Sequence, residues 1–245
     1  MDAGRARLFG RAAGVAASAV VVAGAAHLLQ SRAEAGPRVR LTGAALPEWV
    51  LPTDLLSSVD QAHEHTRLAD DLGLPMVLDE LDAWAALGVL AAAVRLVDTG
   101  SRTSLVVDLG APRSAVSRWC RAVGFPVARE LPAEAGGADL VVRVHPARVR
   151  ADDVDDLLER ASAVLRPGGA VVTTVPVGDD GADGALGRAD LRALVARAHD
   201  LGLVLVGDLD GELGHRLAHL ARVARDGGPD ADGPYALLRL TFRRR

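Results

Sequence analysis

The sequence predicts an α/β protein with a Rossmann-like, doubly wound and mostly parallel sheet, preceded by a helical N-terminal region. Strand-type and helix-type segments alternate after Gly100, as they do when parallel strands are joined by right-handed crossovers. A long stretch with helical spacing of apolar residues precedes this alternation. The first expected strand ends in an aspartate, which is followed by a glycine-bearing turn and a helix.

The expected elements of the sheet region begin at about Ser104. Short apolar runs between turn signals predict strands, and the segments between them have helical spacing. Negative charge opens the helix expected at 152–165, where the helix dipole favours it. The expected strands are 104–108, 125–129, 139–144, 169–175, 203–208 and 235–242, and the expected helices are 115–123, 152–165, 188–201 and 211–225.

Residues 36–100 are expected to form a linker and a helical cap. Prolines and glycines punctuate 36–52, which is typical of a linker. Within 77–97, apolar residues recur at helical spacing and predict one buried face. Trp84 lies in this stripe, so we expect it to be a core residue rather than a cofactor-stacking one.

The N-terminal segment 1–35 is expected to form a separate alanine-rich helix. Residues 12–31 carry no charge, and a helix of that length rises roughly 30 Å, about the thickness of a bilayer's hydrocarbon core. Its alanine and glycine content argues against a membrane span, because these residues contribute little transfer energy. A membrane anchor, a secretory signal peptide and a helix lying on the protein itself therefore stay open.

Composition excludes several function classes. All 28 basic residues are arginine, so the chain has no lysine. This excludes phosphate-loop nucleoside triphosphatases and pyridoxal-phosphate enzymes, because both need a lysine in the active site. The net charge of −4 gives no reason to expect nucleic acid as a partner. The single cysteine, Cys120, excludes an intrachain disulfide and lies in an amphipathic helix as an expected core residue. These features fit a cytoplasmic protein.

The junction between the first strand and its helix is the expected ligand site. Ligands of open α/β sheets bind where the carboxyl end of a strand meets the N-terminus of the next helix. Here the strand ends in Asp108, the turn carries Gly110, and a helix is expected from residue 115. The sequence therefore predicts a nucleotide-like cofactor at this turn.

Three segments in this order resemble class I S-adenosylmethionine-dependent methyltransferases. They are the strand and turn at 104–114, the turn and strand at 165–174, and the final strand at 235–242. The resemblance covers about residues 101–245. It implies S-adenosylmethionine as cofactor and methyl transfer to a small molecule or to a precursor of a cell-envelope component or glycan.

The resemblance also implies which residues bind the cofactor. Asp108 stands at the family's acidic position at the end of the first strand, and Gly110 at the first glycine of its loop. Glu130 follows 22 residues after Asp108, near where an acidic side chain holds the ribose hydroxyls. The implied cofactor-binding residues are Asp108, Gly110, Ala111, Pro112, Ser114 and Glu130.

Two departures from the family pattern keep a second interpretation of the function open. Pro112 and Ser114 stand at the second and third loop glycines, and proline removes an amide donor. Only 31 residues separate Asp108 from Asp139, which leaves room for one strand–helix unit fewer than the family has. The segment 129–142 could equally resemble the family's approach to its fourth strand, and Glu130 would then not be the ribose ligand. The alternative function is a catalytically degenerate binding or scaffold module, with a nicotinamide-binding domain as a third reading.

The sequence does not identify a catalytic residue, and no metal site is expected. The sulfonium cofactor is already activated, so the protein mainly aligns the reactants and excludes water. His215 and His219 have the spacing of a metal pair but lack a third ligand in the sequence pattern, and His63 and His65 lie in a polar stretch. His145 precedes a proline, which favours a turn position over proton abstraction.

Overall fold

A computed structural model describes residues 39–111, 113–144, 151–178, 184–225 and 236–245. Residues 39–245 form one compact unit. The helix expected at 12–31, Pro112 and His145 all lie outside the described residues. In the described part of the chain, no helix combines the length and the apolar character that crossing a membrane requires.

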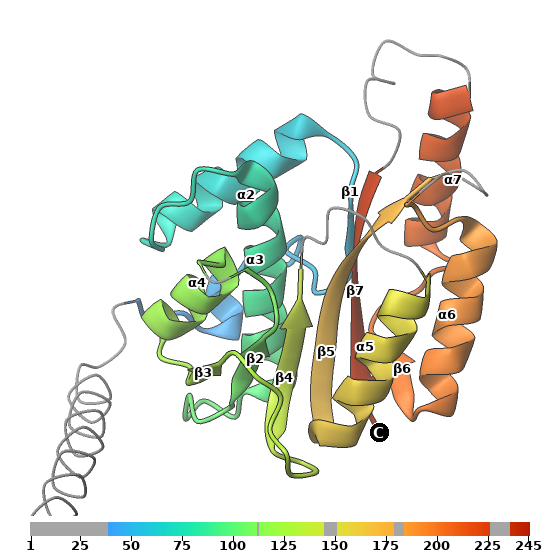
Figure 1. Ribbon diagram of the computed structural model, residues 1–245. Helices are drawn as coiled ribbons and strands as arrows, with labels where there is room; N and C mark the ends of the chain where they lie inside the picture. Colours follow the sequence, from blue (N-terminus) through green and yellow to red (C-terminus); the bar gives the residue numbers. More distant parts are fainter. Residues whose placement is uncertain (1–38, 112, 145–150, 179–183, 226–235) are drawn as a thin grey trace, which may run out of the picture. The chain divides into compact units, whose positions relative to one another are not determined.

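A seven-stranded sheet forms the centre of this unit (Figure 1). Its order is β3-β2-β4-β5-β7, and the far side of β7 pairs with β1 and with β6. Only β7 runs against the other described strands, so the mostly parallel sheet is confirmed. The strands are β1 (Asp54–Leu56), β2 (Val106–Asp108), β3 (Val127–Ala128), β4 (Ala138–Arg143), β5 (Leu165–Val177), β6 (Leu203–Leu205) and β7 (Ala236–Arg244).

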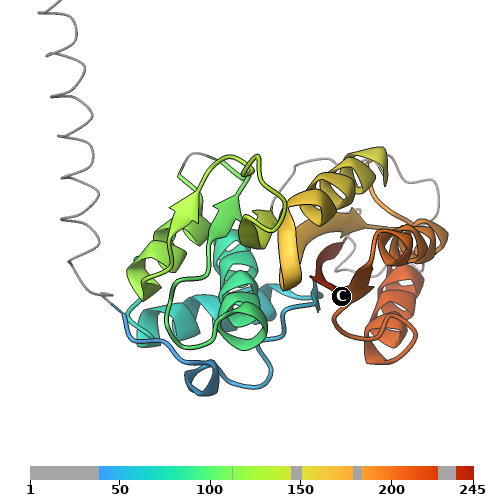
Figure 2. The ribbon, with the colours of Figure 1, turned by 90° about the horizontal axis from the view of Figure 1, so that it is seen from below.

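Helices cover both faces of the sheet (Figures 1 and 2). α3 and α4 bury their apolar residues on one face, and α5 and α6 bury theirs on the other. The four helices expected after Gly100 are present within one residue of their expected bounds. The helices are α2 (Val59–Asp71), α3 (Glu80–Ala92), α4 (Ala115–Val123), α5 (Ala151–Val164), α6 (Arg188–Asp200) and α7 (Glu212–Arg225), with the short helices η1 (Gly43–Ala45) and η2 (Ala93–Val97).

The shortened connection after β2 is also confirmed. Between Asp108 and Asp139 the described chain forms one helix, α4, and one short strand, β3. β2 then pairs directly with β3 on one side and with β4 on the other. The chain therefore has one strand–helix unit fewer here than the pattern that its sequence resembles, and β3 is the edge of the described sheet.

Local sequence explains the ends of α4. The Ser114 side chain accepts a hydrogen bond from the Val116 amide at 3.1 Å and so caps the first turn. Gly124 ends the helix with a φ of 103°, a left-handed conformation that glycine adopts without a steric penalty. The helix buries Trp119 and Cys120, which confirms the expected core position of the cysteine.

β1 and the proline-rich segment before it were not expected in the core. β1 pairs with β7, with Asp54 opposite Arg239. The preceding segment is held by Arg95, which donates to the carbonyl oxygens of Leu46 and Val50, each at 2.7 Å. Backbone carbonyls that lack a strand or helix partner are satisfied in this way by a guanidinium.

A fully buried arginine joins this segment to the sheet. Arg239 donates to the carbonyl oxygens of Pro52 at 3.0 Å, Leu51 at 2.7 Å and Trp84 at 2.6 Å. Its guanidinium lies 4.2 Å from the centre of the Trp84 ring, which adds a cation–π interaction. β7, α3 and the chain before β1 therefore meet at one side chain.

Gly88 makes room for this guanidinium. A Cβ atom at residue 88 would lie 1.9 Å from Cζ of Arg239, well inside contact distance. Burial lowers the pKa of Arg239 to about 10, so the side chain stays charged at neutral pH. A buried charge is stabilised only when its donors are satisfied, and three carbonyl oxygens and the Trp84 ring supply that environment.

We predict that Gly88→Ala destabilises the protein by about 2 kcal/mol or more, because the added methyl group displaces the guanidinium. Helix propensity alone predicts the opposite sign, a gain of about 1 kcal/mol for alanine in the middle of a helix. Denaturant unfolding of the two proteins measures the difference. A stabilised Gly88→Ala variant would contradict the described packing.

The matched control is the same substitution in an Arg239→Met background. Arg239→Met is itself destabilising because three carbonyl oxygens lose their donor. With the guanidinium gone, Gly88→Ala should cost nothing further. A double-mutant cycle therefore gives a large coupling energy between residues 88 and 239 if the two are in contact as described.

Candidate functional site

The candidate site lies where β2, β3 and β4 end together. Val107 pairs with Ala128 of β3 and with Val141 of β4, so the carboxyl ends of the three parallel strands lie at one edge. Asp108 is the last residue of β2, and Ser114 begins α4 immediately after the turn. The expected strand–turn–helix junction is therefore present.

Asp108 is fully buried and engaged at both carboxylate oxygens. Its Oδ1 accepts a hydrogen bond from the Gly110 amide at 2.9 Å. Its Oδ2 accepts from the Ser117 hydroxyl and from Nη1 of Arg129, the latter at 3.0 Å. A carboxylate held this way fixes the conformation of the turn and of the first turn of α4. It is a positioning group rather than a free base.

Arg129 is the residue of this site that the sequence analysis missed. Its Nη2 donates to the Gly110 carbonyl oxygen, while its Nη1 contacts Asp108 and Ser117. The guanidinium therefore bridges the end of β3 and the turn after β2. The sequence carried no signal for it, because the strand register, which places residue 129 opposite Asp108 one step beyond the pair Val107–Ala128, is visible only in the folded sheet.

The six residues implied by the resemblance do not all come together. Asp108, Gly110 and Ser114 surround the turn; a Cβ atom at residue 110 would lie 3.0 Å from Oδ1 of Asp108 and 3.9 Å from Oγ of Ser114. Ala111 is exposed within the turn, and Pro112 lies outside the described residues. Glu130 follows β3 at the same sheet edge with an exposed side chain.

No metal centre forms among the described residues: no three histidine, cysteine or acidic side chains gather with the geometry of a metal site there. His215 and His219 are exposed on α7, and His63 pairs with Glu80 at 2.8 Å. Burial raises the pKa of the Cys120 thiol to about 12, so this cysteine is not a nucleophile at neutral pH.

A concave region lies away from this turn, over β1. It is a cleft of about 690 Å³ that involves α2, β1, the chain before β1, and α7. An ion pair of Asp54 and Arg216, with an N–O distance of 2.9 Å, joins two of its walls. The residues that line it are Trp49, Leu51, Asp54, Gln61, Glu64, His65, Arg67, Leu68, Asp71 and Arg216.

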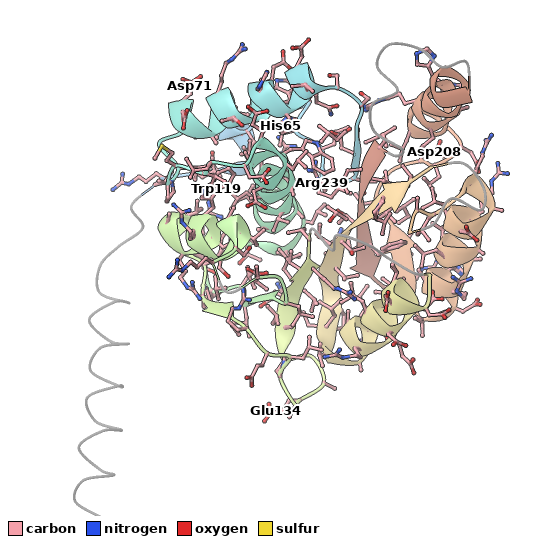
Figure 3. The ribbon with its side chains drawn as sticks, turned by 45° about the horizontal axis from the view of Figure 1, so that its top comes forward. His65, Asp71, Trp119, Glu134, Asp208 and Arg239 are labelled. Atoms are coloured by element: carbon pink, nitrogen blue, oxygen red, sulfur yellow. The ribbon has the colours of Figure 1, made fainter. Side chains whose placement is uncertain are left out.

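Two buried titratable residues, His65 and Asp54, line this cleft, and His65 lacks a full set of hydrogen-bond partners. It lies on α2, close to Arg239 of β7 (Figure 3). Its Nδ1 is 2.7 Å from the carbonyl oxygen of Gln61, and the Trp49 ring meets its ring edge-on at 5.0 Å between centroids. Its Nε2 is buried and has no hydrogen-bond partner among the described residues. Burial is the main cause that lowers the pKa of His65 below its ordinary value.

Comparison with known proteins adds structures but no sequence family. No family model and no curated protein matches the chain. An S-adenosylmethionine-dependent methyltransferase from Leishmania major has 15% identity, with 75% of this chain and 82% of that chain covered and a TM-score of 0.42. Geranyl diphosphate C-methyltransferase from Streptomyces coelicolor has 14% identity, with 76% and 97% covered and a TM-score of 0.38. The fold assignment above follows from the strand order of this chain itself.

We predict that His65 makes the protein less stable as the pH falls below about 6.5. Because its pKa is lowered in the folded state, the unfolded chain binds a proton at a higher pH than the folded protein does. The free energy of unfolding therefore decreases from pH 6.5 down to the folded pKa of this side chain. In His65→Phe that part of the pH dependence should disappear.

Denaturant unfolding at a series of pH values measures this effect. His63→Phe is the matched control, since His63 lies on the same helix and is partly exposed. The control should still lose stability as the pH falls below 6.5, because His65 is unchanged in it. Equal slopes in His65→Phe and in the parent would show that His65 is not protected from protonation.

Proposed function

We propose that this protein binds S-adenosylmethionine at the turn after β2 and transfers its methyl group to a small-molecule acceptor. One observation carries the proposal. At the carboxyl edge of a parallel sheet, buried Asp108 holds the Gly110 amide while Ser114 caps the helix that follows. This is the strand–turn–helix arrangement in which α/β proteins bind nucleotide-like cofactors.

The residues present suit the amino-acid end of the cofactor. Amide groups at the N-terminus of α4 favour a carboxylate, as helix N-termini generally do. Gly110 leaves the turn open, since a side chain at this residue would press on Asp108. The methyl group is activated by the sulfonium itself. The chain's own contribution is therefore to bind, to orient and to exclude water.

Calorimetric titration of the full-length protein with S-adenosylmethionine tests the proposal. We expect saturable binding to the parent and a loss of affinity of at least about tenfold in Asp108→Ala and in Gly110→Val. Asp108→Ala releases the Gly110 amide and the Arg129 guanidinium together, and Gly110→Val fills the turn.

Asp98→Ala is the matched control. The Asp98 side chain is nearly as buried as that of Asp108 and pairs with Arg102 at 2.6 Å, but Asp98 precedes β2, whereas Asp108 is the last residue of β2. This variant should lose stability and keep its cofactor affinity. If both site variants fold and bind as well as the parent, the cofactor site lies elsewhere.

A second candidate function is a binding module that keeps the fold without the cofactor. The contacts of Arg129 favour it, because its guanidinium engages both Asp108 and the Gly110 carbonyl oxygen. Absence of binding by the parent in the same titration, with S-adenosylmethionine and separately with NAD, supports this second candidate.

A further inference from the structure

We propose that the cleft over β1 is a binding site for a small molecule that carries a protonated amine on an apolar or aromatic body. The cleft has a volume of about 690 Å³, which is enough for a small organic molecule. This site is separate from the turn after β2, and the proposal does not depend on the binding of S-adenosylmethionine.

His65 offers the cleft a hydrogen-bond acceptor. The carbonyl oxygen of Gln61 can only accept, so Nδ1 of His65 carries the proton that joins them at 2.7 Å. Nε2 of the neutral ring is then an acceptor, and it is buried without a partner among the described side chains and backbone. A buried acceptor of this kind favours a ligand that brings a donor.

The charges around the cleft favour a cationic donor. Asp54 and Arg216 form an ion pair and offset one another. The remaining charged residues of the lining are Glu64 and Asp71, which are acidic, and Arg67, which is basic. The lining, with three acidic and two basic residues, therefore carries a net charge of −1, and the charged guanidinium of Arg239 also lies close to the neutral His65 ring. An ammonium group satisfies both the charge and the acceptor.

The rim of the cleft favours an apolar or aromatic group on the ligand. Trp49 and Leu51 line the cleft with 46% and 45% of their surface exposed. An indole face also attracts cations, which suits a ligand with an amine next to its apolar part. Exposed apolar residues beside a cleft are typical of ligand sites.

Two arginines, buried Arg239 and partly exposed Arg216, hold this rim in place before any ligand binds. Arg239 donates to the carbonyl oxygens of Leu51 and Pro52, and Arg216 donates to that of Leu55. The chain that carries Leu51 is therefore fixed on both sides. A preformed site loses less conformational entropy on binding than a mobile one.

Benzylamine is the probe for this proposal, observed through the indole N–H signals of the three tryptophans in the full-length protein. Trp49→Phe assigns the signal of the cleft. We expect benzylamine to shift the Trp49 signal saturably and to leave the signals of buried Trp84 and Trp119 nearly unchanged. Benzoate, which has the same ring and the opposite charge, should bind at least about tenfold more weakly. Equal binding of the two probes, or no saturable shift with benzylamine, overturns the proposal.

Variants on α2 separate the acceptor from the charge. His65→Phe should weaken benzylamine binding at least about tenfold, whereas His63→Phe should leave it unchanged. Glu64→Gln with Asp71→Asn changes only exposed residues, so it keeps the fold and should also weaken binding. Its control is Asp60→Asn with Asp70→Asn, which removes the same charge from α2 outside the cleft. Equal affinities in the cleft variants and their controls would contradict the proposed site.

Discussion

The guanidinium of Arg239 is the contact on which the N-terminal part of this unit depends. It lies between β7, α3 and the chain before β1, and it donates to the carbonyl oxygens of Trp84 in α3 and of Leu51 and Pro52 before β1. Gly88 of α3 leaves room for the guanidinium because it has no side chain. Thr241 of β7 adds a second link, since its hydroxyl donates to the Pro52 carbonyl oxygen at 2.8 Å. The final strand thereby binds a segment that is nearly 190 residues away in the chain.

The same contacts determine where the cleft over β1 lies. Asp54 of β1 sits opposite Arg239 in the sheet, and its carboxylate also accepts from Gln61, Trp84 and Arg216. This network fixes α2 and α7 around the cleft. The turn after β2 is built differently, from a carboxylate at a strand end and a guanidinium from the neighbouring strand. Both places use an aspartate and an arginine, in keeping with a chain whose basic residues are all arginine.

Much of the sheet could be predicted because its signals are local. Apolar runs between turns gave six strands, and helical spacing gave the four helices after Gly100. β1 has three residues and follows Pro52, so it is too short for an alternation of apolar and polar residues to predict it. Its pairing partner, β7, lies at the far end of the chain. From the sequence alone, Arg239 would be expected on the exposed face of a strand. Arg129 was missed for a related reason, because its partner is set by strand register and not by spacing along the chain.

Native-state hydrogen exchange of the parent and of Arg239→Met tests most directly whether one buried guanidinium joins the N-terminal helices to the sheet. In the parent, amides in the middle of α3 and of β5 should exchange with the same opening free energy, because they unfold as one unit. In Arg239→Met, the α3 amides should exchange faster than those of β5, since α3 has lost its link to β7. If α3 already exchanges independently of β5 in the parent, or if the variant leaves the two equal, Arg239 does not have this role.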